Sequence, residues 1–230
     1  SFSSLYLSDK NTSAVNAFET EDYVTVTSNN KLAVEASDIV IFALQPRHID
    51  KVLGSVASKI TNNHVVMSVA AGFEISKIES IVGSDKNIVR VMPNTAISIG
   101  KSMTCLSANA KGQDKIELAK DIFNQLGTTM VIPEEQLQAA TVICASGIAF
   151  WMRLVRATTQ GAIQLGFEAH EAHQLALQTC YGAASLLKES GRHPEEEIDR
   201  VTTPSGCTIE GLNEMEHQGL SSSLIKGINA

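Results

Sequence analysis

The chain has 230 residues, a length that leaves one large domain or two modest ones equally open. Apolar residues make up 43% and charged residues 19%, which is the composition of a globular protein and excludes a disordered, collagen-like or coiled-coil chain. The 18 Lys and Arg against 25 Asp and Glu give a net charge of −7, and aromatic residues make up only 5%. Both values argue against a nucleic-acid partner, which needs basic surface and stacking side chains.

The four cysteines, at positions 105, 144, 180 and 207, lie far apart and form no C-x-x-C pair. They predict neither a structural zinc site nor a disulfide framework, and they favour a reducing cytoplasm. The longest uncharged segment, residues 137–152, is shorter than the roughly 18 residues that a membrane helix needs. The first ten residues also lack the basic and apolar regions of a signal peptide. We therefore expect a soluble, cytoplasmic protein with no membrane partner.

Short apolar runs alternate with helical patterns in the first half of the chain. Apolar residues recur at helical spacing over 46–60, and Pro46 suits a first helical turn. The runs at 39–44 and 65–69 are apolar on both faces, as in parallel strands covered by helices. This βαβ pattern predicts a doubly wound parallel sheet that binds ligands at the carboxyl ends of its strands. The expected strands are 5–7, 24–26, 39–44, 65–69, 88–92 and 130–132.

The second half of the chain reads as helical throughout. After Ile132, the sequence Pro133-Glu134-Glu135 is typical of a helix start, and breaks follow at Gly166, at Gly191 and at residues 204–206. We place a domain boundary near residue 133, which gives a sheet domain over 1–132 and an all-α domain over 133–230. The helical domain should pack on the sheet domain or, as we favour, on a second copy of itself. The expected helices are 134–145, 146–165, 169–190, 195–202 and 208–216.

The turn after the first strand contains Ser8-Asp9-Lys10, where a dinucleotide-binding fold holds the adenosine ribose. Asp9 favours NAD and Lys10 keeps NADP open, with slightly more weight on Asp9. The alternative is a solvated turn with no ligand. The glycine motif G-x-G-x-x-G, which should precede this turn, is absent from the 15 glycines. We expect about 25–30 preceding residues to carry it, because the sequence does not begin with Met, and we expect the 230 residues alone to bind a dinucleotide poorly.

Three further strand ends, at 43–46, 68–72 and 92–95, carry small or polar residues that suit a ligand-facing rim. Small side chains let a ligand approach the backbone, and Gly72 permits the positive φ of a turn. Each could be ordinary loop chemistry. Their occurrence at successive strand ends favours a binding site.

The segment 201–212 leads through a turn of small residues into a helix at Thr208. The free N–H groups at such a helix start can bind a carboxylate, although an ordinary capped helix is the alternative. Cys207 has no neighbouring histidine, so we do not expect a nucleophile there. His170 and His173 lie three residues apart, but no third ligand accompanies them, so we expect no metal.

Residues 199–212, together with Val-Arg-Val-Met-Pro-Asn-Thr at 89–95 and Ser-Val-Ala-Ala-Gly at 68–72, resemble the signatures of the pyrroline-5-carboxylate reductase family. The resemblance extends over essentially the whole chain. It implies an α/β protein with a doubly wound, Rossmann-like sheet domain followed by an all-α dimerisation domain. It also implies hydride transfer from NADPH or NADH to the C=N bond of 1-pyrroline-5-carboxylate, giving L-proline, in a homodimer or larger assembly whose helical domains interleave.

The resemblance also implies roles for individual residues. The N–H groups of Cys207 and Thr208 would bind the substrate carboxylate, and the Thr208 hydroxyl would hydrogen-bond the ring nitrogen and assist its protonation. Gly206, Glu134 and Ser146 are the other expected substrate residues. The expected cofactor residues are Ser8, Asp9, Lys10, Asn30, Ala43, Leu44, Gln45, Pro46, Val69, Ala70, Ala71, Gly72 and Asn94.

Two other functions stay open. A related imine or β-hydroxyacid reductase has the same plan, but hydroxyacid enzymes need a catalytic lysine in the helical domain. Between residues 133 and 206 the sequence offers Lys188 alone, beside Glu189 near a helix end. The second alternative is a non-catalytic dinucleotide-sensing module. The chain also departs from the family pattern at Gln45, where a lysine is common, and at Arg156, where an acidic residue is common.

Overall fold

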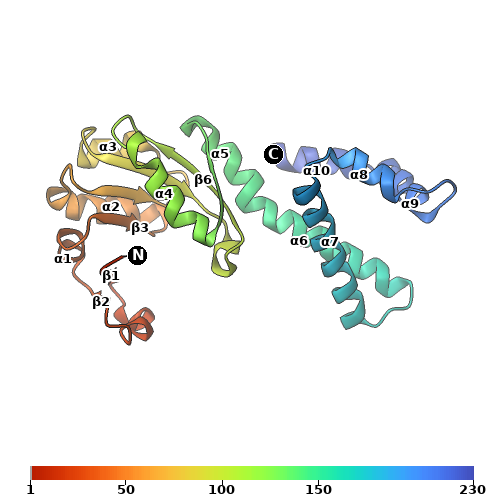
Figure 1. The fold of residues 1–230 in the computed structure, drawn as a ribbon, viewed down its shortest axis with the longest axis horizontal. Helices are drawn as coiled ribbons and strands as arrows, with labels where there is room; N and C mark the ends of the chain where they lie inside the picture. Colours follow the sequence, from red (N-terminus) through yellow and green to blue (C-terminus); the bar gives the residue numbers. More distant parts are fainter. Residues whose placement is uncertain (1) are drawn as a thin grey trace. The chain divides into compact units, whose positions relative to one another are not determined.

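The computed structural model describes residues 2–230 and divides the chain into two compact units, the first ending at Ala145 and the second beginning at Ser146. Figure 1 shows the strands and short helices of the first unit in red to green. Its strands are β1 (Leu5–Ser8), β2 (Val24–Thr27), β3 (Ile39–Phe42), β4 (Val65–Ser68), β5 (Asn87–Met92), β6 (Ser102–Ala108) and β7 (Gly127–Val131). Its α-helices are α1 (Asn30–Glu35), α2 (Pro46–Val56), α3 (Ile75–Val82), α4 (Ile116–Phe123) and α5 (Leu137–Ala140), followed by a π-helix over Thr141–Ser146 that begins in this unit.

The strands form a five-stranded sheet in the order β3-β4-β5-β6-β7 and a two-stranded sheet, β1-β2. Neighbouring strands are parallel except β5 and β6, which are antiparallel. The predicted fold class is confirmed, but β6 was not predicted. Its sequence hides the strand because Ser102, Thr104 and Ser107 are buried polar residues in a short segment. The hydroxyl groups of Ser102 and Thr104 hydrogen-bond each other at 2.9 Å, which satisfies both inside the sheet.

Alternating side chains of the central strands build a separate core on each face of the larger sheet. Val66 and Ile88 belong to a cluster with the buried residues of α2 and α3, whereas Val65, Met67 and Val89 belong to a cluster with α4. Because successive residues of a strand point to opposite faces, β4 contributes to both clusters and all four of its residues are buried. Helices therefore cover both faces, as in a doubly wound fold.

The strand β3 is an edge of the five-stranded sheet, and Ile41 is 43% exposed. Val40 and Phe42 pack with the cluster of α2 and α3 and Ile39 packs with the cluster of α4, as predicted for a strand covered on both faces, and Ile41 is the exposed exception. A groove of about 310 Å³ runs beside this edge and is lined by residues of β1 as well as β3, among them Leu7 and Phe42. Residues of both sheets thus line the same groove.

Residues 134–145 pack against the sheet of the first unit. Leu137 is completely buried in a cluster with Met92 and Cys105, and Cys144 packs against the same cluster. Burial, with the neighbouring Cys144 thiol, raises the pKa of Cys105 to about 11, so this thiol stays protonated and is a poor nucleophile at neutral pH. The units thus divide after residue 145, and the boundary near residue 133 stays a prediction.

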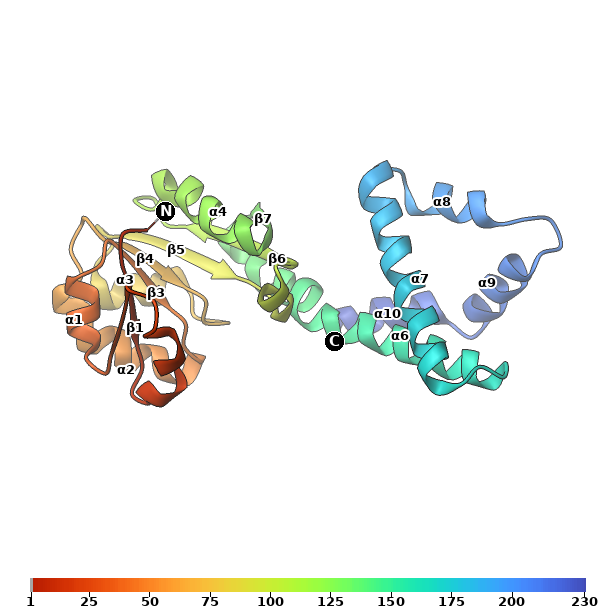
Figure 2. The same ribbon diagram turned by 60° about the horizontal axis from the view of Figure 1, so that its bottom comes forward.

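The second unit is helical, as Figure 2 shows in green to blue. Helices α6 and α7 pack along each other, and Gly191 ends α7 with a φ of 61°. The predicted segment 169–190 coincides with α7, whereas α10 was not predicted because its polar start, with three serines in succession, resembles a loop. The helices are α6 (Gly147–Gln164), α7 (Ala169–Ser190), α8 (Pro194–Val201), α9 (Cys207–His217) and α10 (Leu220–Asn229).

The second unit leaves much of its apolar surface exposed. Among its described helices, only Gly147, Thr159, Ala172 and Ala176 are buried, and none of these has a large apolar side chain. The exposed residues include Trp151 (61%), Met152, Leu165, Tyr181, Leu186, Val201 and Ile225. Large apolar side chains exposed in this number are typical of a unit with an interaction site.

One helical stretch, Glu134–Gln164, is long and apolar enough to cross a membrane by length and composition alone. This corrects the expectation that no segment reaches that length. The expectation considered an uninterrupted uncharged run, which ends before Arg153, whereas the helix continues past Arg153 and Arg156 with mostly apolar neighbours. The stretch is also mostly unburied in the described chain, so its surface needs a partner of some kind.

Candidate functional site

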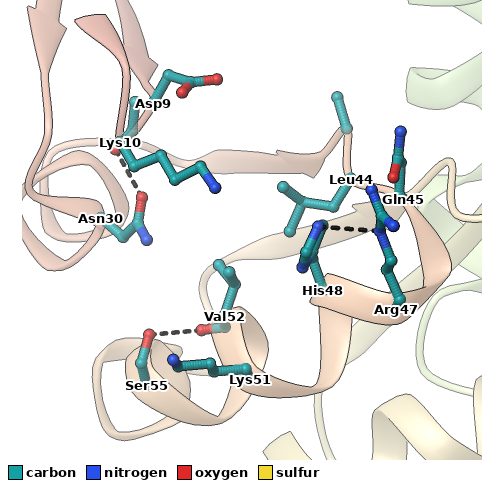
Figure 3. Close-up of a pocket in the computed structure, with 12 residues that line it drawn as sticks. Asp9, Lys10, Asn30, Leu44, Gln45, Arg47, His48, Lys51, Val52 and Ser55 are labelled. Carbon is teal, nitrogen blue, oxygen red and sulfur yellow. Dashed lines mark hydrogen bonds between the residues drawn. The ribbon is translucent and has the colours of Figure 1, made fainter.

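A cavity of about 660 Å³ lies at the carboxyl ends of β1 and β3 (Figure 3). In a doubly wound fold this edge of the sheet is where ligands bind. The residues that line it come from the turn after β1, the start of α1, the turn after β3 and one face of α2. They are Ser8, Asp9, Lys10, Asn30, Ala43, Leu44, Gln45, Arg47, His48, Lys51, Val52 and Ser55.

Hydrogen bonds fix the wall of the cavity that follows β1. The Ser8 hydroxyl donates to Oδ1 of Asn30 at 2.6 Å, which ties the end of the strand to the first residue of α1. The side chain of Asn29 accepts from the backbone N–H groups of Lys31 and Leu32 and so caps that helix. Oδ1 of Asp9 accepts the backbone N–H of Asn11 at 2.7 Å. The polar groups on this wall are therefore held in place without a ligand.

The opposite wall is the exposed face of α2. This helix begins at Pro46, after Gln45 as its N-cap, and buries the three aliphatic side chains Ile49, Leu53 and Val56 against the sheet. Residues between these buried positions then face the cavity, namely Arg47, His48, Lys51, Val52 and Ser55. In Figure 3 the Nε atom of Arg47 donates to Nε2 of His48, at 3.2 Å.

Sequence reasoning missed Arg47, His48 and Lys51. The signal for them was available, because the predicted helix over 46–60 buries positions 49, 53 and 56, which leaves 47, 48 and 51 on its other faces. Seven of the predicted cofactor residues line the cavity together: Ser8, Asp9, Lys10, Asn30, Ala43, Leu44 and Gln45.

The remaining predicted cofactor residues lie on neighbouring turns outside this cavity. Pro46 is the first residue of α2, and the N–H of Val69 donates to the carbonyl oxygen of Phe42 at 3.2 Å. Ala70 is buried and Ala71 is exposed, while Gly72 has a φ of 69°, which agrees with the positive φ expected there. Their part in cofactor binding stays a prediction.

The side chain of Asn94 is occupied by the protein itself. Its Nδ2 donates to the carbonyl oxygen of Cys144 at 3.0 Å, and its Oδ1 accepts the N–H of Ala96 at 3.0 Å. Asn94 thus joins the end of β5 to the π-helix. A cofactor contact would have to use its backbone or displace one of these hydrogen bonds.

Glu134, a predicted substrate residue, links β5 and α3 within the first unit. Its Oε1 atom accepts both the Nη1 of Arg90, at 2.8 Å, and the backbone N–H of Ile75, at 2.7 Å. Arg90 is only 8% exposed, so this carboxylate stabilises a guanidinium charge that is buried away from water. Ile75 is the first residue of α3, and Glu74 provides no side-chain cap, so Glu134 also acts as the anionic cap of that helix.

The turn before α9 has the geometry expected of an anion site at a helix start. Ser205 has a positive φ of 58°, and the N–H of Gly206 donates to the carbonyl oxygen of Thr203 at 3.0 Å. A β-carbon on Gly206 would lie 2.4 Å from Oγ1 of Thr203, so a larger residue at this N-cap would require Thr203 to shift. Because glycine has no side chain to cap the helix, the N–H groups of Cys207 and Thr208 are left for another acceptor.

Ser146 and the two histidines of α7 are exposed in the structure. Ser146 is the exposed last residue of the π-helix and precedes Gly147, the buried first residue of α6. His170 and His173 are exposed on α7. In the described residues 2–230, no group of three or more His, Cys, Asp or Glu side chains could hold a metal ion.

The cavity fits the adenosine end of a dinucleotide. Leu44 and Val52 offer aliphatic surface for a base, Ser8 and Asn30 offer polar groups for a ribose, and the basic side chains of α2 suit a phosphate. The fold and this cavity thus define a Rossmann-type dinucleotide-binding protein with a helical carboxyl-terminal unit.

Comparisons with known proteins specify this class further. Residues 134–230 match the family model described as pyrroline-5-carboxylate reductase dimerisation, and residues 4–72 match that described as NADP oxidoreductase, coenzyme F420-dependent. The chain is 46% identical to pyrroline-5-carboxylate reductase 1 of Dictyostelium discoideum over 97% of its own length, but it spans only 43% of that protein. It is 40% identical to pyrroline-5-carboxylate reductase 2 of the same organism, over 90% of this chain and 75% of that protein. The chain belongs to the pyrroline-5-carboxylate reductase family.

Solved structures agree with this assignment. The pyrroline-5-carboxylate reductase of Coxiella burnetii is 27% identical and superposes with a TM-score of 0.91 over 97% of this chain and 84% of that chain. A Plasmodium falciparum pyrroline carboxylate reductase with NADP bound is 21% identical and superposes with a TM-score of 0.83 over 98% of this chain and 94% of that chain, which shows the shared fold.

Proposed function

We propose that the protein catalyses the reduction of 1-pyrroline-5-carboxylate to L-proline with NADPH or NADH, the last step of proline biosynthesis. The observation that carries the proposal is the identity to the two Dictyostelium reductases, supported by the cavity at the ends of β1 and β3 and by the uncapped start of α9. When bound, the nicotinamide cofactor supplies the hydride. The residues of this chain then need to bind and orient the substrate and keep its ring nitrogen protonated.

The substrate is a cyclic imine with a carboxylate, and it accepts a hydride readily only when its ring nitrogen is protonated. The N–H groups of Cys207 and Thr208 would bind the carboxylate, because a helix start attracts anions. The Thr208 hydroxyl would hydrogen-bond the ring nitrogen and keep its proton in place. Catalysis then rests on positioning the reactants, and no strong base is required.

The alternatives have less support in the structure. A β-hydroxyacid reductase needs a lysine in the helical unit, and Lys188 is an exposed residue in the last turn of α7, where Lys188 and Glu189 both face solvent. A dinucleotide-sensing module without activity would not need the glycine N-cap or the free hydroxyl at Thr208. We therefore rank both functions below the reductase.

Proline-dependent reduction of NAD⁺ or NADP⁺ at high pH, followed by nicotinamide absorbance, tests the proposal on the complete natural protein. High pH favours this direction because the reaction releases a proton. We expect activity that requires proline. A complete protein that is folded but shows no activity with either nucleotide would favour the sensing module.

We further propose that the apolar surface of the second unit is covered by a second copy of the chain in a cytoplasmic homodimer, rather than by lipid or nucleic acid. The support is the match of residues 134–230 to a dimerisation region and the exposed apolar side chains of α6 and α7.

Trp151→Glu tests this second proposal. We expect light scattering to give at least twice the chain mass for the natural protein. In the variant, the dissociation constant of the dimer should rise about 10-fold or more, because buried tryptophans dominate interfaces. Ile99→Glu places the same charge at an exposed apolar position of the first unit and should leave the assembly intact. A monomeric mass for the natural protein in light scattering, or sedimentation of the protein with lipid vesicles, would contradict the homodimer.

A further inference from the structure

Positive charge gathers around the cavity at the ends of β1 and β3. Lys10, Arg47 and Lys51 all line it, and Asp9 is the one carboxylate among its lining residues, all of which lie in the described part of the chain. The whole chain carries a net charge of −7, so this cavity has the opposite sign to the chain as a whole. A local excess of positive charge in a concave site attracts anions.

The protein does not neutralise these cations. Within residues 2–230, no carboxylate lies within 4.0 Å of the charged groups of Lys10, Arg47 or Lys51. Arg47 and Lys51 are four residues apart on α2, a spacing at which like charges destabilise a helix. Arg47 also lies in the first turn of α2, where the helix dipole disfavours a cation. Unfavourable charge interactions of this kind within a helix are typical of a ligand-binding site.

Asp9, which would favour NAD, is already partly engaged. A carboxylate that recognises an unmodified ribose uses its oxygens to accept from the ribose hydroxyl groups. One of the two oxygens of Asp9 instead accepts the backbone N–H of Asn11 at 2.7 Å. In Figure 3 the side chain of Lys10 extends from this turn toward the α2 wall, from which Lys51 projects.

From these observations we infer that the cavity selects the dinucleotide that carries a 2′-phosphate, NADP(H), over NAD(H), and that Lys10 and Lys51 are its specificity-determining residues. This inference rests on the proposed function for its biological meaning. The phosphate monoester carries about two negative charges at neutral pH, and ammonium groups bind it as point charges. The Ser8 oxygen can still accept from the ribose and Nδ2 of Asn30 can still donate to it, and Leu44 and Val52 remain available for the base.

Calorimetric titration of the complete natural protein with 2′,5′-ADP and with 5′-AMP tests the inference without the nicotinamide reaction. We expect 2′,5′-ADP to bind about 10-fold or more tightly than 5′-AMP, because it alone makes the charge-assisted contacts. Lys10→Gln and Lys51→Gln should each weaken 2′,5′-ADP binding by about 10-fold and change 5′-AMP binding by less than about 2-fold. Lys77→Gln removes the same charge from α3, outside the cavity, and is the matched control.

Equal affinity for the two probes, no binding of either, or equal losses for both probes in the lysine variants would overturn the inference. Losses as large in Lys77→Gln would do so as well, because they would indicate a general charge effect. The proposed function fails separately. If the protein prefers 2′,5′-ADP through Lys10 and Lys51 but shows no proline-dependent reduction, the inferred NADP(H) selectivity is supported and the proposed reductase activity is contradicted.

Discussion

Glu134→Ala is expected to lower the free energy of unfolding by about 2–4 kcal/mol, because it leaves the buried guanidinium of Arg90 without its partner. The same change removes the acceptor for the N–H of Ile75 at the start of α3. Urea unfolding followed by circular dichroism measures the effect. Glu135→Ala, at the neighbouring exposed position, should stay within about 0.5 kcal/mol of the natural chain.

A double-variant cycle separates the ion pair from the cap. Arg90→Met removes the buried charge, so Glu134→Gln should cost less in that background than in the natural chain, with a coupling of about 1 kcal/mol or more. If Glu134 instead served only as a substrate contact, Glu134→Gln would raise KM and leave the urea midpoint unchanged. An unchanged midpoint in Glu134→Ala would contradict the structural role.

The sequence predicted the alternation of strands and helices because buried strands and amphipathic helices leave strong local patterns. The segment 65–69 illustrates this, since β4 is buried on both faces as expected. Local pattern failed where tertiary contacts decide. The strand β6 buries polar residues because it lies between β5 and β7 in the sheet, and these two neighbours cannot be read from residues 102–108 alone.

The candidate site was predicted where a residue type and its place in the fold agree. Ser8, Lys10 and Asn30 lie on one cavity because the turn after a strand and the start of the next helix are neighbours in any doubly wound fold. Glu134 shows the limit of this approach. The family resemblance predicts a substrate contact for Glu134, which stays a prediction. Its hydrogen bond with Arg90, 44 residues away in the chain, is a pairing that only the folded structure reveals.

Thr208→Ala is expected to reduce kcat/KM for 1-pyrroline-5-carboxylate by about 10–100-fold, the loss of a contact worth about 1.5–3 kcal/mol to a charged group. The structure supports a free hydroxyl here. Among the described residues, the Thr208 side chain has no hydrogen-bond partner, whereas Thr202, six residues earlier, donates to the carbonyl oxygen of Ile198. A half-buried hydroxyl beside an uncapped helix start is available to a ligand.

Two further variants decide whether the hydroxyl itself acts. Thr208→Ser keeps the hydroxyl and should restore most of the rate, whereas Thr20→Ala makes the same truncation on an exposed turn of the first unit and should leave kcat/KM unchanged. Because protonation of the ring nitrogen precedes hydride transfer, Thr208→Ala should lower the rate most at high pH, where the free imine predominates. A rate in Thr208→Ala equal to that of the natural protein, or an equal loss in Thr208→Ser, would show that the backbone N–H groups of α9 bind the substrate without the hydroxyl.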